Sequence, residues 1–517
     1  MMLFVSCTDN FHELNTNPAL ISEDQLEVGM LFTNVQKNSI FHQFSYNHQT
    51  QQIGYLEHQG NSVLPERQTT LLMSWARNYI RPLNDIIRLG SRDPLRANQV
   101  AIARIYRVWI FHQLTDGYGD IPYSQMGLSQ EEAINYPEYE RQEDIYRDML
   151  DELDEAVADL SDDPDLLNYG RADLLYGGDV NMWRRFGNSL RFRLAMRVRF
   201  ADAQLASEHI NAVINEPLIS EREHIASVIT EGEDADIIGN RNPMYNHDVT
   251  NEIPAYANHT TSELLQVRND PRLSIYYDPA PEPHEGDLWR GRPVNIDVGF
   301  EEEYDGQWTG FYAQERNARL GEHFIQAEYE IKILHAPEVY FLRAEAAMEG
   351  ITNESAEAMH REGIRQAMEL YDVDPGDINA YLDSDAGRLD GSYEENLEEI
   401  IVQKYLSNFM LYTESWAEHR RTGYPTVWAG QRGDITNPNH RTPWRRYTYP
   451  TDEYLKNRSN VEAAVNRLSG GDHNWASRVW WDQRPGLPLF HPRHLQFPPH
   501  VHMEFDPMNE PGEIDED

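Results

Sequence analysis

The sequence predicts a mostly α-helical protein in which helix pairs pack against a loop-rich part. Three observations favour this fold class. The stretch 101–124 begins as an almost continuously apolar helix, and such a helix belongs inside a sizeable domain. Helix–turn–helix patterns recur at 182–215 and 337–371. Residues 220–330 show weak periodicity and many Pro, Gly, Asn, Tyr and Trp residues, which is typical of loops with short strands.

The first part of the chain reads as helices separated by irregular segments. We expect a helix over 31–46, an irregular span over 49–66 and a helix over 68–89 that is interrupted near Pro82. The apolar helix that follows should stop at the sequence DGYGD. Gly117 and Gly119 can supply a positive φ there, so we expect a rigid polar turn after the helix.

The middle of the chain carries helices with one apolar face. Apolar residues recur at three- and four-residue spacing between 145 and 160, which predicts an amphipathic helix. A helix over 182–200 carries many arginines, which fall largely off its apolar row and can pair with the surplus carboxylates. A helix over 204–215 follows after a short break and should form an antiparallel pair with it.

Helices return after residue 330. We expect a pair over 337–348 and 354–371, followed by one long helix over 394–420. The helix–turn–helix units resemble tetratricopeptide repeats, although their period is degraded. We interpret four helix tryptophans as structural, namely Trp75, Trp109, Trp183 and Trp416.

The charge of the chain is extreme. The formal net charge is −42 and the pI is about 4.7, which argues against binding of nucleic acid or of an anionic membrane through a basic surface. Lysine occurs only at Lys37, Lys332, Lys404 and Lys456. At about 1 M salt the Debye length falls to about 3 Å, so dense carboxylates barely repel one another. The composition therefore favours a halophilic or marine source, and an acidic protein from an ordinary habitat is the alternative.

The N-terminal residues predict a lipid anchor rather than a membrane-spanning segment. No apolar run approaches the roughly 20 residues that cross a bilayer. Cys7 is the only cysteine, which excludes a disulfide within one chain. The residues Phe4-Val5-Ser6-Cys7 resemble the end of a bacterial lipoprotein signal, in which the cysteine is lipidated, although the basic start and most of the apolar segment are missing.

Several stretches together resemble the SusD/RagB family of nutrient-binding outer-membrane lipoproteins. They occur in the expected order along the chain as LTDGYGDIPYS (114–124), MWRRFGNSLRFRLAMRVR (182–199), NDPRLSIYY (269–277), EVYFLRAEAAMEG (338–350), IIVQKYLSNFMLYTESWAEHRRTGYP (400–425), YPTDEYLKNRSNVEAA (449–464) and RVWWD (478–482). The resemblance implies a SusD-like fold with tetratricopeptide-like helix pairs packed against a loop-rich ligand-binding region. It also implies lipidation of Cys7, a place on the surface of the outer membrane, and a SusC-like TonB-dependent transporter barrel as partner.

The resemblance divides the chain and suggests its role. Residues 1–7 are the remnant of a lipoprotein signal, 8–482 form a single SusD-like domain, and 483–517 are a Pro/His-rich acidic extension beyond the family core. The implied function is capture of oligosaccharides and their delivery to the transporter, without bond cleavage. Two alternatives remain open: capture of peptides or another small nutrient in the same kind of complex, and a tetratricopeptide scaffold that binds only proteins.

A glycan site needs flat aromatic faces surrounded by polar partners for hydroxyl groups. The loop-rich regions offer candidates for both. We predict ligand contacts from Tyr55, His58, Tyr245, Trp289, Trp308 and Tyr312, although core packing is the alternative for each of them.

The chain lacks the sequence patterns of the common enzymes and cofactor sites. It contains no G-x-S-x-G, H-E-x-x-H or G-x-x-x-x-G-K-[ST], so we expect neither an enzyme nor a cofactor. Asp383, Asp385 and Glu394 match three positions of a calcium loop, but Arg388 stands where that loop needs glycine. We therefore expect a solvated acidic loop and no metal. The tail histidines, among them His491 and His494, fit an irregular extension better than a metal site.

Overall fold

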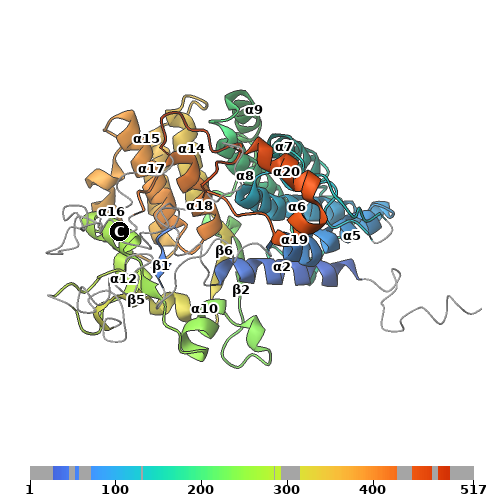
Figure 1. Cartoon of the computed structure of the whole chain (residues 1–517). Helices are drawn as coiled ribbons and strands as arrows, with labels where there is room; N and C mark the ends of the chain where they lie inside the picture. Colours follow the sequence, from blue (N-terminus) through green and yellow to red (C-terminus); the bar gives the residue numbers. More distant parts are fainter. Residues whose placement is uncertain are drawn as a thin grey trace, which may run out of the picture.

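The computed structural model is mostly helical, and its short strands lie together on one side of the helices (Figure 1). Most helices stand in the upper part of this view, with α2 (Val28–Phe44) along their lower edge. The strands lie at the level of α2 or below it, and α10 (Pro243–Tyr245) lies below. The structure describes residues 27–45, 53–57, 71–129, 132–283, 286–292, 315–427, 445–468 and 476–488. These observations confirm the predicted fold class.

The helices up to residue 213 follow the predicted order. The helix expected over 31–46 begins a little earlier, at Val28, and ends at Phe44. The one expected over 68–89 begins at Leu71, and its α-helical hydrogen bonding is interrupted near Pro82, as predicted, by a π-helical turn over Ala76–Ile80. The elements are α4 (Leu71–Trp75), a π-helical turn (Ala76–Ile80), α5 (Arg81–Gly90), α6 (Ala97–Tyr118), α7 (Gln142–Ala158), α8 (Val180–Val198) and α9 (Ala203–Val213).

The part from 220 to 330 holds short elements, as predicted. One antiparallel sheet has the strand order β1-β3-β5-β4, and β2 pairs antiparallel with β6 in a second sheet. The strands are β1 (Leu56–Glu57), β2 (Ala226–Ile229), β3 (Tyr256–Ala257), β4 (Tyr277–Asp278), β5 (Arg319–Leu320) and β6 (Glu330–Leu334). Besides α10, this part contains α11 (His259–Val267) and α12 (Leu273–Tyr276).

The remaining helices complete the helical layer. They are α14 (Ala336–Met348), α15 (Ala356–Glu369), α16 (Pro375–Leu382), α17 (Tyr393–Ser407), α18 (Tyr412–Thr422), α19 (Thr451–Lys456) and α20 (Arg458–Arg467). Consecutive helices pack against each other as α6 with α7, α8 with α9, and α14 with α15, which is the pairing of tetratricopeptide-like units.

The expected single helix over 394–420 is wrong in one respect. The chain breaks it between α17 and α18, where Met410 adopts a positive φ of 73°. Neither glycine nor proline marks this position, and apolar residues continue through it at helical spacing. No sequence pattern therefore predicts the break between these two helices.

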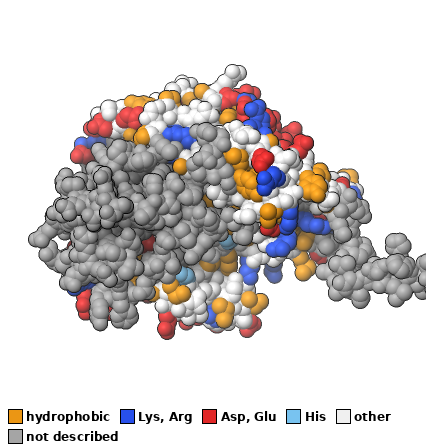
Figure 2. All heavy atoms as spheres, viewed as in Figure 1, with side chains coloured by type: hydrophobic (Ala, Val, Ile, Leu, Met, Phe, Trp, Pro, Cys, Tyr) orange, Lys and Arg blue, Asp and Glu red, His pale blue; other side chains and the backbone are white. Residues whose placement is uncertain are grey.

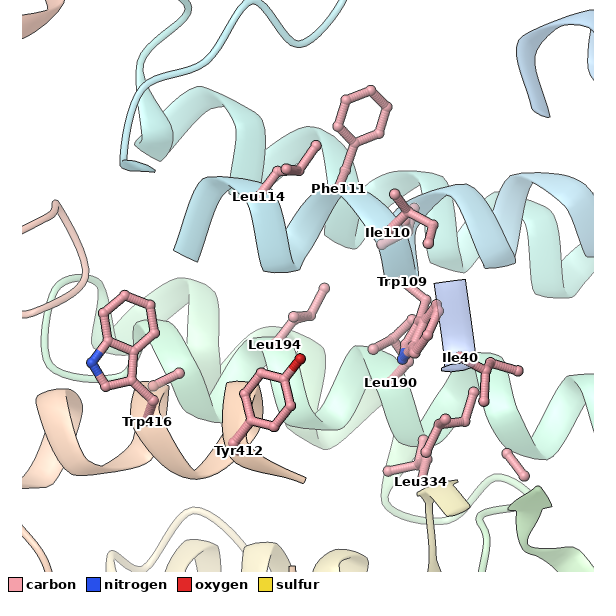
Figure 3. Packing of buried hydrophobic residues seen from close by; sticks show 14 of the residues in the cluster. Ile40, Trp109, Ile110, Phe111, Leu114, Leu190, Leu194, Leu334, Tyr412 and Trp416 are labelled. Carbon is pink, nitrogen blue, oxygen red and sulfur yellow. The ribbon is translucent and has the colours of Figure 1, made fainter. Parts of the chain in front are cut away.

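Helix α6 lies at the centre of the main core. Trp109 is 1% exposed, and Figure 3 shows it between Ile110 of its own helix and Leu190 of α8. The four helix tryptophans predicted to be structural are all buried: Trp75, Trp109, Trp183 and Trp416. Burial of an aromatic side chain of this kind contributes about 1.5–3 kcal/mol in the transfer of apolar surface alone.

The turn after α6 differs in detail from the prediction. The helix continues through Asp116 and Gly117, so only Gly119 of the two glycines has a positive φ, at 84°. Its backbone N–H still donates to the Thr115 carbonyl at 2.7 Å, and its positive φ then turns the chain out of the helix. Gly117 is needed for another reason: a Cβ there would lie 2.5 Å from the Tyr447 ring.

The arginines of α8 do pair with carboxylates, but inside the protein rather than on its surface. Arg193 lies 2.7 Å from Glu338 of α14. Arg197 lies 2.5 Å from Glu414 and 2.9 Å from Glu418, both on α18. All five side chains are at most 6% exposed. The three helices are therefore joined through buried ion pairs.

The same network extends to α17 and to the end of α8. Lys404 of α17 lies 3.0 Å from Glu414 and 3.3 Å from Glu418. Arg199 and Arg421 share Glu345 of α14, each at 2.7 Å. The buried charges thus form a connected and roughly neutral set, which is the condition under which charges tolerate burial.

Two neutral histidines beside this network make stability depend on pH. Burial, with nearby Arg193, lowers the pKa of His112 to about 3, and burial, with nearby Lys332, lowers that of His335 to about 3. Below pH ~6.5 these two histidines bind protons in the unfolded chain but stay neutral in the folded chain. Their contribution to the free energy of unfolding is therefore fully present above pH ~6.5 and is lost as the pH falls towards about 3.

We expect the free energy of unfolding to fall between pH 7 and pH 4. Urea unfolding in about 1 M salt, which suppresses surface repulsion, measures this. The variant with His112→Gln and His335→Gln should show a shallower slope over the same interval. Equal stability of the wild-type chain at pH 7 and pH 4 would contradict the assignment.

Candidate ligand-binding site

The loop that carries Tyr245 is held rigidly on the loop-rich side. Asn242 is fully buried; its Oδ1 accepts from the Met244 N–H at 2.9 Å, and its Nδ2 donates to the Phe324 and Gln326 carbonyls at 2.8 Å. Tyr245 follows at the end of α10 and is half-buried. A π-helical turn over Asn246–Thr250 comes next, and such turns are frequent at functional sites.

Tyr245 lies close to an acid, and the segment that precedes it carries exposed apolar side chains. Partial desolvation, and then the hydrogen bond with Glu233, raise the pKa of Tyr245. Ile229, Ile237 and Ile238 are each more than half exposed, at 68%, 59% and 56%. Exposed hydrophobic side chains also gather at the lower edge of Figure 2, over the position of α10 in Figure 1. Such exposure on a fixed loop is typical of a contact surface.

Trp289 is the second candidate that keeps accessible surface. It is half-buried and packs partly against the main core. Its backbone N–H donates to Asp287 Oδ1 at 3.2 Å, and its carbonyl accepts from the Ser262 hydroxyl. Within the described part of the chain its ring does not stack on that of Tyr245, so the two aromatics are separate elements of the loop-rich side.

The structure places Tyr55 in the core, which corrects its prediction as a ligand contact. Its side chain is 0% exposed. Its ring stacks on that of Tyr405 with centroids 4.5 Å apart, and its hydroxyl donates to the Tyr405 carbonyl at 2.7 Å. The sequence around Tyr55 is rich in Gln, Gly and His and reads as exposed, but β1 carries this segment under α17 and α18. The other candidates, His58, Trp308 and Tyr312, and Cys7 as well, lie outside the described residues.

Sequence reasoning missed a set of polar side chains beneath the loop-rich surface. No pattern in the sequence identified them, because their segments read as irregular and exposed. The buried residues are Glu57, Asn258, His259, Glu263, Arg290, Arg292 and Asn317. One of them, the Arg292 guanidinium, lies over the Tyr256 ring at 4.9 Å. Amides, carboxylates and guanidiniums are the groups that bind hydroxyl groups.

The calcium-loop residues do not assemble into a site. Glu394 is bound by Arg484 at 2.5 Å and by the Tyr424 hydroxyl at 2.9 Å, whereas Asp383 lies 3.5 Å from Arg361. Among the residues that the structure describes, no group of three or more His, Cys, Asp or Glu side chains is placed to hold a metal ion. Within the same ranges, every helix is too short or too polar to cross a bilayer.

The structure thus combines helix pairs with a loop-rich part on which Tyr245 and Trp289 keep accessible surface. The chain belongs to the SusD-like family, whose model is described as starch-binding and associating with the outer membrane and matches residues 9–450. The family resemblance seen in the sequence is thereby confirmed. Members of this family bind without catalysis, so the chain is not an enzyme.

Solved structures show the same fold. A chitin-binding protein shares 24% identity with a TM-score of 0.75, over 88% of this chain and 100% of that one. A SusD homologue from Bacteroides uniformis shares 25% identity with a TM-score of 0.73, over 88% of this chain and 98% of that one. A chitin-binding SusD homologue from Flavobacterium johnsoniae shares 21% identity with a TM-score of 0.72, over 89% and 98%. No curated protein matches the chain.

Proposed function

We propose that this chain captures oligosaccharides at the cell surface and delivers them to a SusC-like TonB-dependent transporter barrel. The observation that carries the proposal is the family match over residues 9–450, because it spans both the helix pairs and the loop-rich part. The names of two similar structures, both chitin-binding, support a carbohydrate as the ligand. Ligand transfer is by binding and release, with a lipid anchor at Cys7 as the only membrane attachment.

The ligand-binding role belongs to the loop-rich side in this proposal. Tyr245 and Trp289 keep accessible ring surface there, and sugar C–H groups pack on such faces. Exposed Ile238, whose carbonyl accepts from the side chain of the neighbouring Asn246, adds apolar surface in this proposal. The domain in this proposal spans 8–482, since Trp481 is fully buried and donates its indole N–H to Asp116 of α6 at 2.8 Å. His58, Trp308 and Tyr312 complete the proposed set of ligand contacts.

Removing the Tyr245 ring should weaken oligosaccharide binding. We expect Tyr245→Ala to raise the Kd by about tenfold, because one aromatic contact is worth about 1 kcal/mol beyond its buried area. Isothermal titration calorimetry with chitin- and starch-derived oligosaccharides measures it. The matched control is Tyr136→Ala, since Tyr136 is 65% exposed and belongs to the loop before α7.

This titration, together with a docking measurement on the purified barrel, distinguishes oligosaccharide capture from the two alternative functions. An unchanged Kd for Tyr245→Ala would remove Tyr245 from the site. Binding of peptides in place of oligosaccharides would change the ligand class but keep the capture role. A purified transporter barrel that docks while neither ligand class binds would replace capture by a protein-binding scaffold.

A further inference from the structure

Residues 231–241 form a closed loop directly before the turn that carries Tyr245. The Glu231 N–H donates to the Asn240 carbonyl at 3.0 Å, and Asn240 Nδ2 donates back to Glu231 Oε1 at 2.8 Å. Lys37 of α2 donates to Asn240 Oδ1. Compact loops whose ends lie close together are frequently functional. The 231–241 loop is therefore closed by its own residues and tied to α2.

Arg241 holds the interior of this loop. Its guanidinium Nη2 donates to the Glu233 carbonyl and, at 3.3 Å, to the Ala235 carbonyl. Its backbone N–H donates to the Ile238 carbonyl at 3.1 Å. Both acceptors of the guanidinium are neutral carbonyls, in a chain with 86 acidic residues. Because a guanidinium is planar and rigid, this side chain sets the shape of the loop by holding two carbonyls close together.

Glu233 connects the loop to Tyr245. The Glu233 carbonyl is held by Arg241, and its exposed carboxylate accepts a hydrogen bond from the Tyr245 hydroxyl. A second contact joins the same two segments, since Asn246 Nδ2 donates to the Ile238 carbonyl at 3.0 Å. The Tyr245 hydroxyl and the residue after Tyr245 are therefore both bound to the loop that Arg241 holds.

The Tyr245 ring needs such support to act as a binding surface. Tyr245 is half-buried, so neighbouring side chains do not confine the ring as they would in the core. A side chain that must be ordered on binding weakens the affinity about threefold to tenfold. Hydrogen bonds that fix the ring beforehand remove this cost. The contact between Glu233 and the Tyr245 hydroxyl therefore bears on affinity as well as on the stability of the loop.

We propose that Arg241 is a positioning residue of the ligand-binding site. It fixes the 231–241 loop so that Glu233 holds the Tyr245 ring in the orientation that receives the face of a sugar. Arg241 itself does not contact the ligand in this assignment and acts only through Tyr245. The inference rests on the proposed function, because it requires the Tyr245 ring to contact the ligand.

A double-mutant cycle between Arg241 and Tyr245 tests this assignment. We expect Arg241→Gln to raise the Kd for chitin- or starch-derived oligosaccharides about threefold to tenfold in the wild-type chain. The same substitution should leave the Kd unchanged in the Tyr245→Ala background, because no ring remains to be positioned. A role in loop stability alone would weaken binding in both backgrounds. Equal increases in the two backgrounds, or no increase in the wild-type chain, would overturn the assignment.

A second variant keeps the test decisive if Arg241→Gln lowers the stability of the chain. The Glu233 side chain is exposed, so Glu233→Ala should fold like the wild-type chain. We expect Glu233→Ala to raise the Kd by a similar factor, and again only when Tyr245 is present. The same increase without Tyr245 would count against positioning.

A measurement without ligand checks the contact itself. The tyrosinate absorbance of the wild-type chain minus that of Tyr245→Phe reports the pKa of Tyr245. Besides partial desolvation, the hydrogen bond with the Glu233 carboxylate raises this pKa, so Glu233→Gln should lower it. An unchanged pKa would show that Glu233 does not hold the ring, and it would also overturn the assignment.

The matched control is Arg361→Gln. Arg361 is also half-buried, and its Nη1 donates to the Leu382 and Gly387 carbonyls of another loop. It belongs to α15, which lies in the upper part of Figure 1, whereas α10 lies at the bottom. The Kd of this control should not change. If Tyr245→Ala itself left the Kd unchanged, the proposed site would fail; if only Arg241→Gln did, the site would stand and this inference alone would fail.

Discussion

Replacing Arg197 by methionine is expected to lower the free energy of unfolding by about 3–5 kcal/mol. Arg197 is fully buried and holds Glu414 at 2.5 Å and Glu418 at 2.9 Å. Methionine fills a similar volume but leaves the two carboxylates with less compensating charge in a dry interior. Burial raises the pKa of Glu414, but Arg197, Lys404 and Arg193 outweigh it and hold that pKa below its usual range.

Urea unfolding of Arg197→Met against the wild-type chain measures this loss. The matched control is Lys456→Met, because Lys456 forms an ion pair with Asp452 at 2.9 Å while both side chains are about 70% exposed. An exposed pair of this kind contributes at most about 1 kcal/mol. Similar losses in the two variants would show that the interior network adds nothing beyond a surface pair.

Replacing Gly117 by valine is expected to cost about 3 kcal/mol, the upper end of the range for overpacking. A Cβ at this position would lie 2.5 Å from Cε2 and 2.6 Å from Cδ2 of Tyr447. The Tyr447 ring has no room to move away, because it is buried and stacks on Trp416 with centroids 4.9 Å apart. The clash therefore displaces the segment around 447 from α6, to which it is bound by a 2.7 Å hydrogen bond from the Tyr447 N–H to the Gly117 carbonyl.

The thermal midpoint of Gly117→Val compared with Gly239→Val measures this effect. Nothing lies within 4 Å of a Cβ at Gly239, so that control should change stability by no more than about 0.5 kcal/mol. If the two variants melted together, close packing against Tyr447 would not be the reason for a glycine at 117.

Much of the fold could be predicted because local sequence patterns identify its helices. The apolar run of α6, the turn at Gly119 and the amphipathic faces of α7 and α8 depend on residues a few positions apart. Order and spacing of the family motifs supplied the rest of the architecture. The break at Met410 was missed because residues on both sides continue the same periodicity, and only packing separates α17 from α18.

The candidate site was far less predictable. Tyr55 and Tyr245 stand in similar loop-rich sequence, yet one is fully buried against Tyr405 while the other keeps exposed ring surface. Aromatic residues suit cores and glycan platforms equally well, so composition alone does not distinguish them.

By itself the sequence determined the helical class, the family and the absence of the common catalytic patterns, since these follow from local periodicity and from motifs. Only the tertiary structure decided which charges are buried and which surfaces are concave. The arginines of α8 look like a solvated face in sequence, but Glu338, Glu414 and Glu418 arrive from helices more than a hundred residues away. Burial and concavity depend on such distant segments meeting, and no local pattern records that meeting.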